Sequence, residues 1–427
     1  MLSTLLLIFK ALGLTFKQLT IHLSLVLTPR LHRLTYRSVP HPKNIVIIGA
    51  SFAGYHAARR LASTVPTGYR VVIIERNSHF QLTWVLPRFS VVGGHEHKAF
   101  IPYKGYLAPV AEGAYTWVNG SVGSVIVSDG DAPKGQGKVV LGESGEEIEF
   151  EYLVVATGAV ASGLPSRVGV MTKVEGMKVL VGEQERIRAA RDVVVLGGGA
   201  AGVEMAGDVK ERYPEKNVTL VHSRERLLNR GYGEGLSRRA LEGLEGLGVT
   251  VLLGERVVDG DHNLTGEVRL KSGGVVKCDC LVKCVGQRPN SGLVAKVSPL
   301  SVTESGHIRV RPSLQLADEA CSRIYAAGDV IEVNTVQNAR GALQQAEVVA
   351  RNIVRAIKGK RLVVYRPNWW ESATKLTLGL KKSVMYMSDG SAELIVSTKS
   401  KEELDSARVW KYFGLKPFND TSKEKTI

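Results

Sequence analysis

The stretch from Asn44 to Glu75 limits the possible folds more than any other part of the chain. Two short apolar runs, residues 45–48 and 71–74, flank a turn of small residues and a helix-forming segment. The turn consists of Gly49, Ala50, Ser51, Phe52, Ala53 and Gly54. An apolar strand, a glycine turn, a helix and a second strand ending in an acid are typical of a β-α-β unit that binds a dinucleotide.

Each part of this unit has a physical reason. Gly49 permits the tight turn, and Gly54 allows the helix to pack closely on the strand. The helix N-terminus directs free N–H groups and the positive end of its dipole toward a pyrophosphate. Glu75, with Arg76 beside it, is placed to bind the ribose of an adenosine. Ser51 stands where the fingerprint usually has a glycine. The alternative is a unit of the same shape that binds no ligand.

A second unit of the same kind lies further along the chain. Residues 193–196 form an apolar run, residues 203–209 are helix-forming, and residues 218–221 form the next apolar run. The turn residues at the fingerprint are Gly197, Gly199, Ala200 and Gly202. Two such units predict two dinucleotides, and the chemistry of a nicotinamide, which delivers hydride, complements that of a flavin, which accepts it.

The end of the second unit bears on which nicotinamide coenzyme binds. His222 and Arg224 follow the strand, where an acid usually meets the free 2′-hydroxyl of NADH. Arg224 suits the 2′-phosphate of NADPH; the alternative is that Arg224 faces solvent and the coenzyme is NADH. Glu204, in the first turn of the helix, either faces the nicotinamide or complements the helix dipole. Both coenzymes therefore stay open.

Three further apolar runs, residues 152–158, 281–290 and 324–332, contain the turns that would complete the two units. Their candidate binding residues are Ala156, Thr157, Gly158, Gly286, Gly328 and Asp329. An acid at Asp329 can bind the ribityl hydroxyls of a flavin, and the alternative, a helix N-cap, is compatible with that role.

The periodicity of the remaining segments predicts their secondary structure. Alternation of apolar and polar residues predicts antiparallel strands within residues 117–155, with turns at 129–130 and 144–145, and a strand at 306–316. Residues 338–355 are predicted to form a helix. Its packed stripe would be Ala342, Ala346, Val349, Ala350 and Ile353.

The cysteines argue against thiol chemistry. The chain has four, Cys278, Cys280, Cys284 and Cys321, and none lies near the first unit, where a redox disulfide would sit if the protein were a disulfide reductase. The spacing C-x-C-x₃-C has no histidine pair beside it and is poor for zinc. We therefore predict structural thiols and no metal site.

The N-terminal segment has an unusual composition. Residues 1–36 are apolar and basic and contain no acid. Apolar residues recur as on one stripe of a helix, at Leu2, Leu5, Leu6, Phe9, Leu12, Phe16, Leu19 and Leu23. An interfacial membrane helix, a mitochondrial presequence and a signal anchor are the competing interpretations, with an ordinary soluble helix as the alternative. We expect a membrane-associated protein, on the cytoplasmic face of a membrane or in the mitochondrion.

The formal net charge of +15 fits attraction to anionic lipid or to phosphate-bearing cofactors, or else a plain solvated surface. The sequence has no nucleic-acid-binding module and no basic groove interleaved with aromatic residues. A specific nucleic-acid partner is therefore not expected.

Taken together, these segments resemble the two-dinucleotide flavoprotein oxidoreductases. The resemblance covers residues 43–390 and is carried by GASFAG, Glu75, ATG, GGGAAGVE, VGQRPN and YAAGDV. The missing redox cysteines and the segment ATKLTLGLKKSVMY make the chain most similar to the apoptosis-inducing-factor-like, ferroptosis-suppressor-type branch. That branch neighbours the type II NADH:quinone oxidoreductases.

The resemblance implies FAD in the first unit, NADH or NADPH in the second, and electron delivery to a quinone or another small acceptor at a membrane surface. It is compatible with a monomer or a homodimer. Type II quinone reductases usually begin the last flavin helix with Ala-Gln and place a second Gln four residues on. The matching positions here are Arg340 and Gln344, and Gln344 remains a candidate cofactor contact.

The predicted fold is α/β with glutathione-reductase-like architecture: two Rossmann-like domains, the NAD domain inserted in the FAD domain, and a small α+β C-terminal domain. The predicted boundaries are 1–40 for the N-terminal segment, 41–165 and 300–360 for the FAD domain, 166–299 for the NAD(P)H domain, and 361–427 for the C-terminal domain.

The predicted function is that of an FAD-dependent NAD(P)H oxidoreductase that passes electrons to a quinone-type acceptor. The side chains would position the cofactors, and no acid–base catalytic residue is expected. The alternatives are a reductase of a small redox protein and a slow-turnover, NADH-sensing signalling flavoprotein.

Overall fold

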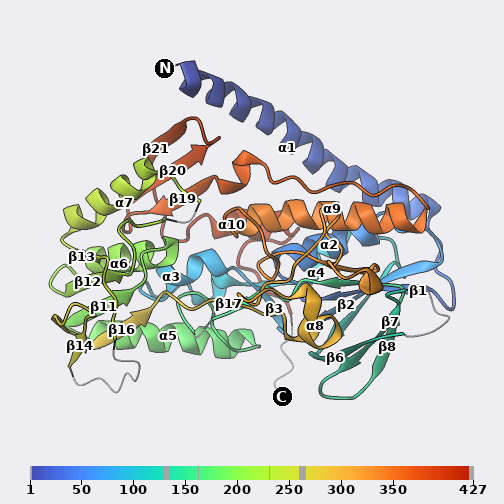
Figure 1. Ribbon diagram of the computed structural model, residues 1–427, viewed down its shortest axis with the longest axis horizontal. Helices are drawn as coiled ribbons and strands as arrows, with labels where there is room; N and C mark the ends of the chain where they lie inside the picture. The colour runs from blue at the N-terminus through green and yellow to red at the C-terminus, as the bar shows by residue number, and fades with distance from the viewer. Residues whose placement is uncertain (1, 129–133, 162, 230, 259–265, 423–427) are drawn as a thin grey trace.

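A computed structural model describes residues 2–128, 134–161, 163–229, 231–258 and 266–422 of the protein. Two parallel sheets with helices packed on them dominate the architecture (Figure 1). This is the α/β class that the sequence predicts.

The first sheet has the strand order β18 (Ile324–Ala326), β9 (Tyr152–Val155), β1 (Lys43–Ile48), β2 (Tyr69–Glu75) and β5 (Tyr115–Asn119). All neighbouring strands in it are parallel. The buried parts of the central strands, residues 45–48, 71–74 and 152–155, are apolar because both of their faces are covered. In sequence, the second sheet lies between β9 and β18, so the chain leaves the first sheet and later returns to it.

The second sheet has the strand order β13 (Thr250–Leu253), β12 (Asn217–His222), β11 (Asp192–Leu196) and β16 (Cys280–Lys283), again all parallel. Each sheet contributes to its own buried apolar cluster. The two predicted Rossmann-like units are therefore present, while the exact residue boundaries of the domains stay a prediction.

Helices position the turns that follow the strands. α2 (Phe52–Ala62) packs along α9 (Ala339–Ile357) and contacts β1 and β2 of the first sheet. α6 (Ala200–Arg212) packs against α7 (Glu234–Leu247), and α5 (Lys173–Ala189) lies on the opposite side of the second sheet in Figure 1.

α9 confirms the helix predicted at 338–355. The Asn338 side-chain oxygen accepts hydrogen bonds from the N–H groups of Arg340, at 2.9 Å, and Gly341, at 3.0 Å, and so caps the helix. All residues of the predicted stripe are buried: Ala342, Ala346, Val349, Ala350 and Ile353.

A smaller antiparallel sheet confirms the strands predicted within residues 117–155. It consists of β6 (Val122–Val127), β7 (Gly137–Leu141) and β8 (Glu147–Phe150). The predicted turn at 144–145 joins β7 to β8, and the turn predicted at 129–130 lies outside the described residues.

The strand predicted at 306–316 is wrong. These residues make only isolated bridges within the described chain, among them Val310 with Leu316. The chain reverses between the two because the Leu314 N–H donates to the Arg311 carbonyl and Leu314 has a φ of 67°. Pro312, which has no N–H group, also suits a turn better than a strand.

The C-terminal part of the chain packs against both sheets. β19 (Thr374–Thr377), β20 (Lys382–Ser388) and β21 (Glu393–Lys399) form an antiparallel sheet whose apolar side chains join the second core. α10 (Ser406–Tyr412) instead places Trp410 in the first core. This C-terminal segment therefore contacts both cores and connects them.

The other short elements connect these layers. They are β3 (His79–Gln81), β4 (Phe100–Pro102), β10 (Ala159–Val160), β14 (Glu267–Arg269), β15 (Val275–Lys277), β17 (Arg288–Pro289), α3 (Leu86–Phe89), α4 (Lys104–Leu107), α8 (Gly292–Val297), and the 3₁₀ turns η1 (Thr83–Val85), η2 (Glu96–Ala99), η3 (Pro299–Ser301), η4 (Glu319–Cys321) and η5 (Trp369–Ser372).

The N-terminal segment forms one long helix, α1 (Leu2–Thr35), which runs across the molecule from the side of β21 to the side of β1 in Figure 1. Its part Leu6–Thr35 is the one helix of the described chain long and apolar enough to cross a membrane, by length and composition only. The described side chains of the predicted stripe are exposed: Leu6, Phe9, Leu12, Leu19 and Leu23. Leu2, Leu5 and Phe16 lie outside the described side chains.

A buried ion pair joins the two halves of the molecule. Arg88 in α3 donates from Nε to the Asp208 carboxylate of α6 at 2.6 Å, and both side chains are fully buried. Arg88 also donates to the Gly379 carbonyl, which lies between β19 and β20, at 2.8 Å. Burial raises the pKa of Asp208 to about 6, although Arg88 opposes that shift.

We expect Arg88→Ala to lower the free energy of unfolding by about 3–5 kcal/mol, because it leaves a buried carboxylate without its partner. Urea unfolding followed by circular dichroism measures the change. Lys138→Ala is the control, since it removes an exposed pair with Glu147 and should cost at most about 1 kcal/mol. Equal losses in the two variants would contradict a joining role for Arg88.

Candidate functional site

The turn after β1 is formed by a very close backbone approach. Gly49 has a φ of 91°, a conformation that favours glycine. A Cβ at Gly54 would lie only 1.8 Å from the Gly49 carbonyl oxygen. Both positions therefore accept only glycine, as the fingerprint predicts.

The N-terminus of α2 opens onto this turn. The first hydrogen bond of the helix runs from the Tyr55 N–H to the Ser51 carbonyl at 2.9 Å. The N–H groups of Phe52, Ala53 and Gly54 precede that bond and lie at the end of the helix where an anion is favoured. This geometry suits a pyrophosphate.

The acid at the end of β2 is part of the same turn. The Glu75 carboxylate is buried and accepts the Ala50 N–H at 2.5 Å. It also accepts the backbone N–H of Asn77, at 2.8 Å, and its side-chain amide, at 2.7 Å. Glu75 thus holds the turn in shape. Arg76, the other residue predicted here, is exposed.

Two more of the predicted segments meet at this turn. A Cβ at Gly49 would lie 2.6 Å from the Ala156 carbonyl oxygen, so the end of β9 touches the turn. A Cβ at Gly328, which has a φ of 86°, would lie 3.2 Å from the Ala53 Cβ. The structure therefore brings together candidates that are far apart in the sequence.

Asp329 lies beside this assembly. Its carboxylate is partly exposed and lies 3.7 Å from the Arg167 guanidinium. Burial raises the pKa of Asp329, and the nearby Arg167 and His307 oppose the shift. Arg167 carries no motif that the sequence analysis could have recognised.

α9 contributes a residue that the prediction missed. The Gln345 side-chain oxygen is buried and accepts the Gly328 N–H at 2.7 Å, whereas the predicted Gln344 is only half-buried. The available signal was the helical period, because Gln345 lies three residues after Ala342 and falls on the buried stripe.

The second turn repeats the geometry of the first. Gly197 has a φ of 113°, and a Cβ at Gly202 would lie 1.8 Å from the Gly197 carbonyl oxygen. At Gly199, by contrast, a Cβ would meet nothing within 4 Å among the described residues. Ala200 opens α6, so the N-terminus of this helix also adjoins open space.

His222 takes the structural position that Glu75 holds in the first unit. Its Nδ1 accepts the Gly198 N–H at 3.0 Å, which requires the ring to be neutral at that nitrogen. Burial lowers the pKa of His222, and Arg224 adds to that effect. Arg224 itself is exposed two residues further on.

Glu204 is engaged by the chain itself. Its carboxylate accepts the Thr377 N–H of β19 at 3.0 Å. Burial raises the pKa of Glu204 to about 7, and the Thr377 hydrogen bond opposes that shift. A contact of Glu204 with the nicotinamide stays a prediction. The contact that is observed, with Thr377, attaches α6 to β19.

The closing turns of the two units are hydrogen-bonded to each other. The Thr157 hydroxyl donates to the Asn290 carbonyl at 2.6 Å, and the Asn290 N–H donates to the Gly158 carbonyl at 2.9 Å. β10 and β17, one from each unit, pair beside them. Gly286, in the loop before β17, has a φ of 84°.

Three of the four cysteines are buried, which is consistent with the structural role that the sequence predicts. All four thiols are free: Cys278, Cys280, Cys284 and Cys321. Burial raises the pKa of Cys278, Cys280 and Cys321 to about 11. The described residues also contain no group of ligands that could hold a metal ion.

The geometry fits two dinucleotides. Each unit has a helix N-terminus with free N–H groups and a pair of glycines packed too closely for a Cβ atom. In the second unit there is also room for a ligand beside Gly199. Glu75 and Asp329 add carboxylates at the first turn, where ribose and ribityl hydroxyls need acceptors.

Comparison with known proteins gives the class. The family model described as pyridine nucleotide-disulphide oxidoreductase matches residues 43–346. The chain therefore belongs to this family, and it is an oxidoreductase that uses FAD and NAD(P)H.

Individual relatives are consistent with the predicted branch. The chain is 33% identical to Fe-regulated protein 8 of Mycosarcoma maydis, over 87% of this chain and 95% of that protein. It is 30% identical to ferroptosis suppressor protein 1 of Homo sapiens, over 76% of this chain and 83% of that protein.

Solved structures show the same fold at low identity. The sulfide:quinone oxidoreductase of Aquifex aeolicus has a TM-score of 0.69 at 18% identity, covering 87% of this chain and 90% of that one. A ferredoxin reductase of Rhodopseudomonas palustris has a TM-score of 0.61 at 22% identity, covering 81% and 82%.

We expect Gly199→Ala to fold and to retain FAD but to weaken NADH binding on the order of tenfold, a loss of about 1.4 kcal/mol. The added methyl group meets no protein atom and would occupy ligand space. Fluorescence titration with NADH measures the dissociation constant. Gly182→Ala in α5 also meets nothing within 4 Å of the described chain and is the matched control. Unchanged affinity in Gly199→Ala would place the coenzyme elsewhere.

Proposed function

We propose that the protein transfers electrons from NAD(P)H through FAD to a quinone-type acceptor at a membrane. The observation that carries this proposal is the pair of nucleotide-binding turns joined through Thr157 and Asn290, with no reactive thiol among the four cysteines. Without a redox disulfide to relay them, the electrons would pass from the reduced flavin directly to the acceptor.

The choice of a quinone has separate support. The sequence resembles the branch that neighbours the type II NADH:quinone oxidoreductases, and a protein of the same fold is named for a quinone acceptor. The exposed apolar helix α1 would bring the protein to the compartment where hydrophobic quinones dissolve. A mitochondrial location and the oligomeric state stay predictions.

In this proposal the residues act by binding and orientation. The first turns of α2 and α6 hold the two pyrophosphates, Glu75 and Asp329 accept hydroxyls of the first nucleotide, and His222 supports the second turn. FAD, when bound, accepts hydride from the nicotinamide and passes electrons on singly or in pairs.

The hydrogen bonds between the closing turns act on both units. Because Thr157 and Asn290 tie the end of one unit to the end of the other, these hydrogen bonds would hold the two nucleotide sites at a fixed separation. Such positioning converts an encounter of two reactants into a step within one complex.

The function is tested by steady-state oxidation of NADH with short-chain quinones, preceded by anaerobic reduction of the flavin. We expect bleaching of the flavin by NADH and turnover with quinones on the order of 1 s⁻¹ or faster. Flavin reduction without quinone turnover would overturn the quinone assignment. Electron transfer to a ferredoxin-type protein alone, or a long-lived reduced complex, would favour the two alternatives.

We expect Arg224→Glu to lower the preference for NADPH over NADH about tenfold or more, since a charged contact to the 2′-phosphate becomes a repulsion. The ratio of kcat/KM for the two coenzymes measures this. Lys271→Glu, an equal charge change at another exposed position, is the control. An unchanged ratio in Arg224→Glu would show that this side chain faces solvent in the complex as well.

A further inference from the structure

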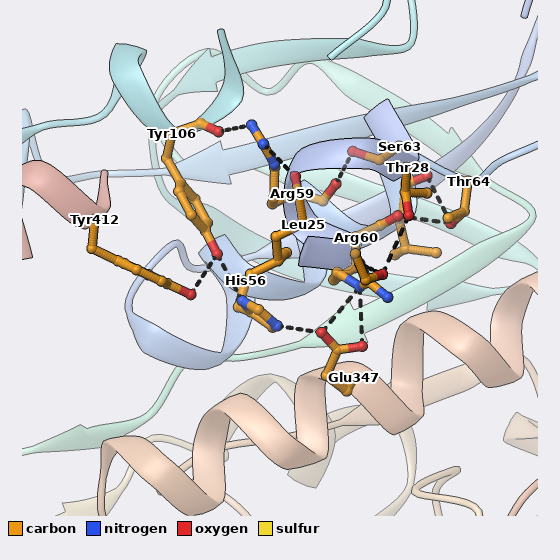
Figure 2. Close-up of polar contacts among 12 residues, drawn as sticks. Leu25, Thr28, His56, Arg59, Arg60, Ser63, Thr64, Tyr106, Glu347 and Tyr412 are labelled. Carbon is orange, nitrogen blue, oxygen red and sulfur yellow. Dashed lines mark hydrogen bonds and ion pairs between the residues drawn. The ribbon is translucent and has the colours of Figure 1, made fainter. Parts of the chain in front are cut away.

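The C-terminal half of α1 is fastened to α2 at a break in its own hydrogen bonding. Pro29 lies inside α1 and has no N–H to donate to the Leu25 carbonyl one turn earlier. Arg59 of α2 takes that role, donating from Nη2 to the Leu25 carbonyl at 3.0 Å, and its side chain is buried (Figure 2). A guanidinium from the folded body therefore completes the helix.

Neighbouring contacts extend this attachment. Arg60 donates to the Ser24 hydroxyl at 3.1 Å and to the Glu347 carboxylate of α9 at 3.0 Å. Glu347 also contacts His56 Nε2 at 2.7 Å, so α1, α2 and α9 share one polar network (Figure 2). At the end of α1, His32 contacts the Val65 carbonyl at 2.7 Å.

The N-terminal half of α1 is attached as well. Leu7 is fully buried, and Lys10 forms an ion pair of 2.5 Å with Asp389, which lies between β20 and β21. Leu7 and Leu25 are separated by 18 residues, or five turns of 3.6 residues, so one face of α1 follows the body along its length. α1 is therefore a strap that is held at both ends.

The opposite face of this strap is apolar and exposed. Leu6, Phe9, Leu19, Leu23, Leu31 and Leu34 are each more than half exposed. At 100° per residue they fall on the side of the helix away from Leu7 and Leu25. Exposed apolar side chains that recur along one face of a helix in this way are uncommon on soluble monomers and mark an interaction site.

The charge around this face indicates the partner. Residues 1–74 contain no acid, and two arginines close in sequence to Leu31 and Leu34 are exposed: Arg30 within α1 and Arg37 two residues after its end. A leucine-rich face with arginines and no carboxylates complements a lipid surface that carries negative charge.

We propose that the exposed face of α1 lies in the plane of an anionic phospholipid bilayer and seats the whole protein on it. The proposal rests on the proposed function, because it supplies the membrane contact that a lipid-borne acceptor requires. A helix whose inner face is bound to the protein at Leu7, Leu25 and Pro29 lies along the surface rather than across the bilayer.

The test uses the full-length, FAD-loaded protein and sedimentation with vesicles of phosphatidylcholine, with or without phosphatidylserine. We expect binding to the mixed vesicles, and a loss of more than tenfold in the partition constant for the double variant Leu19→Glu, Leu23→Glu. Arg30→Gln with Arg37→Gln should weaken binding to the anionic vesicles by about fivefold per charge, and leave the residual binding to neutral vesicles unchanged.

The control is Val275→Glu with Leu300→Glu, which changes two exposed apolar residues away from α1 and should leave vesicle binding intact. NADH oxidation with short-chain quinones should be equal in all variants, so a failure of the quinone assay and a failure of vesicle binding are separate results. Equal partition of the α1 variant and its control would overturn the proposal.

Two further outcomes would also overturn it. One is a dimer in lipid-free solution that Leu19→Glu, Leu23→Glu dissociates, which would assign the face to a second copy. The other concerns how deeply α1 lies in the bilayer. Nitroxide labels attached at Leu6→Cys, Leu19→Cys and Leu34→Cys report the depth of each position through their accessibility to oxygen and to a nickel chelate. Equal depths at the three positions support a helix in the plane, and a deep centre with shallow ends would show a spanning helix.

Discussion

In both parallel sheets, the helix after the first strand begins where one glycine lies against the carbonyl of another. Gly54 on Gly49 and Gly202 on Gly197 leave the same 1.8 Å between a would-be Cβ and the carbonyl oxygen. This contact sets the direction of each helix, and hence where its free N–H groups and dipole act. Binding of a nucleotide thus depends first on backbone geometry, and the side chains of Glu75 and His222 hold the two turns in that shape.

The two units act together because a few polar contacts cross between them. Arg88 and Asp208 form a buried pair that also binds a backbone carbonyl before β20, and Glu204 binds the backbone of β19. Buried charges are expensive to desolvate, so their presence here is better explained by what they position than by net stability. These two contacts also attach the C-terminal sheet, through β19 and the turn before β20, to both units.

The sequence was sufficient for features that depend on local rules. The glycines of both turns, the α9 stripe and the antiparallel strands follow from backbone sterics and periodicity, and the structure confirms them. The strand predicted at 306–316 failed because a reversal at Leu314 overrides the alternation. The assignment of individual cofactor contacts stays a prediction.

Contacts between distant segments had no sequence signal. Gln345 could have been suspected from its place on the buried stripe, whereas the partners of Arg88 and Arg59 are set by the tertiary fold. The apolar period of the N-terminal segment correctly indicated a helix. Which side of it faces outward could only be known from the positions of Leu7 and Leu25.

The buried thiols have a consequence for durability. With a pKa near 11, a cysteine at pH 7 is ionised in only about one molecule in ten thousand, and the thiolate is the form that peroxides attack. Oxidants that disable thiol-dependent enzymes should therefore find little to react with at Cys278, Cys280 or Cys321.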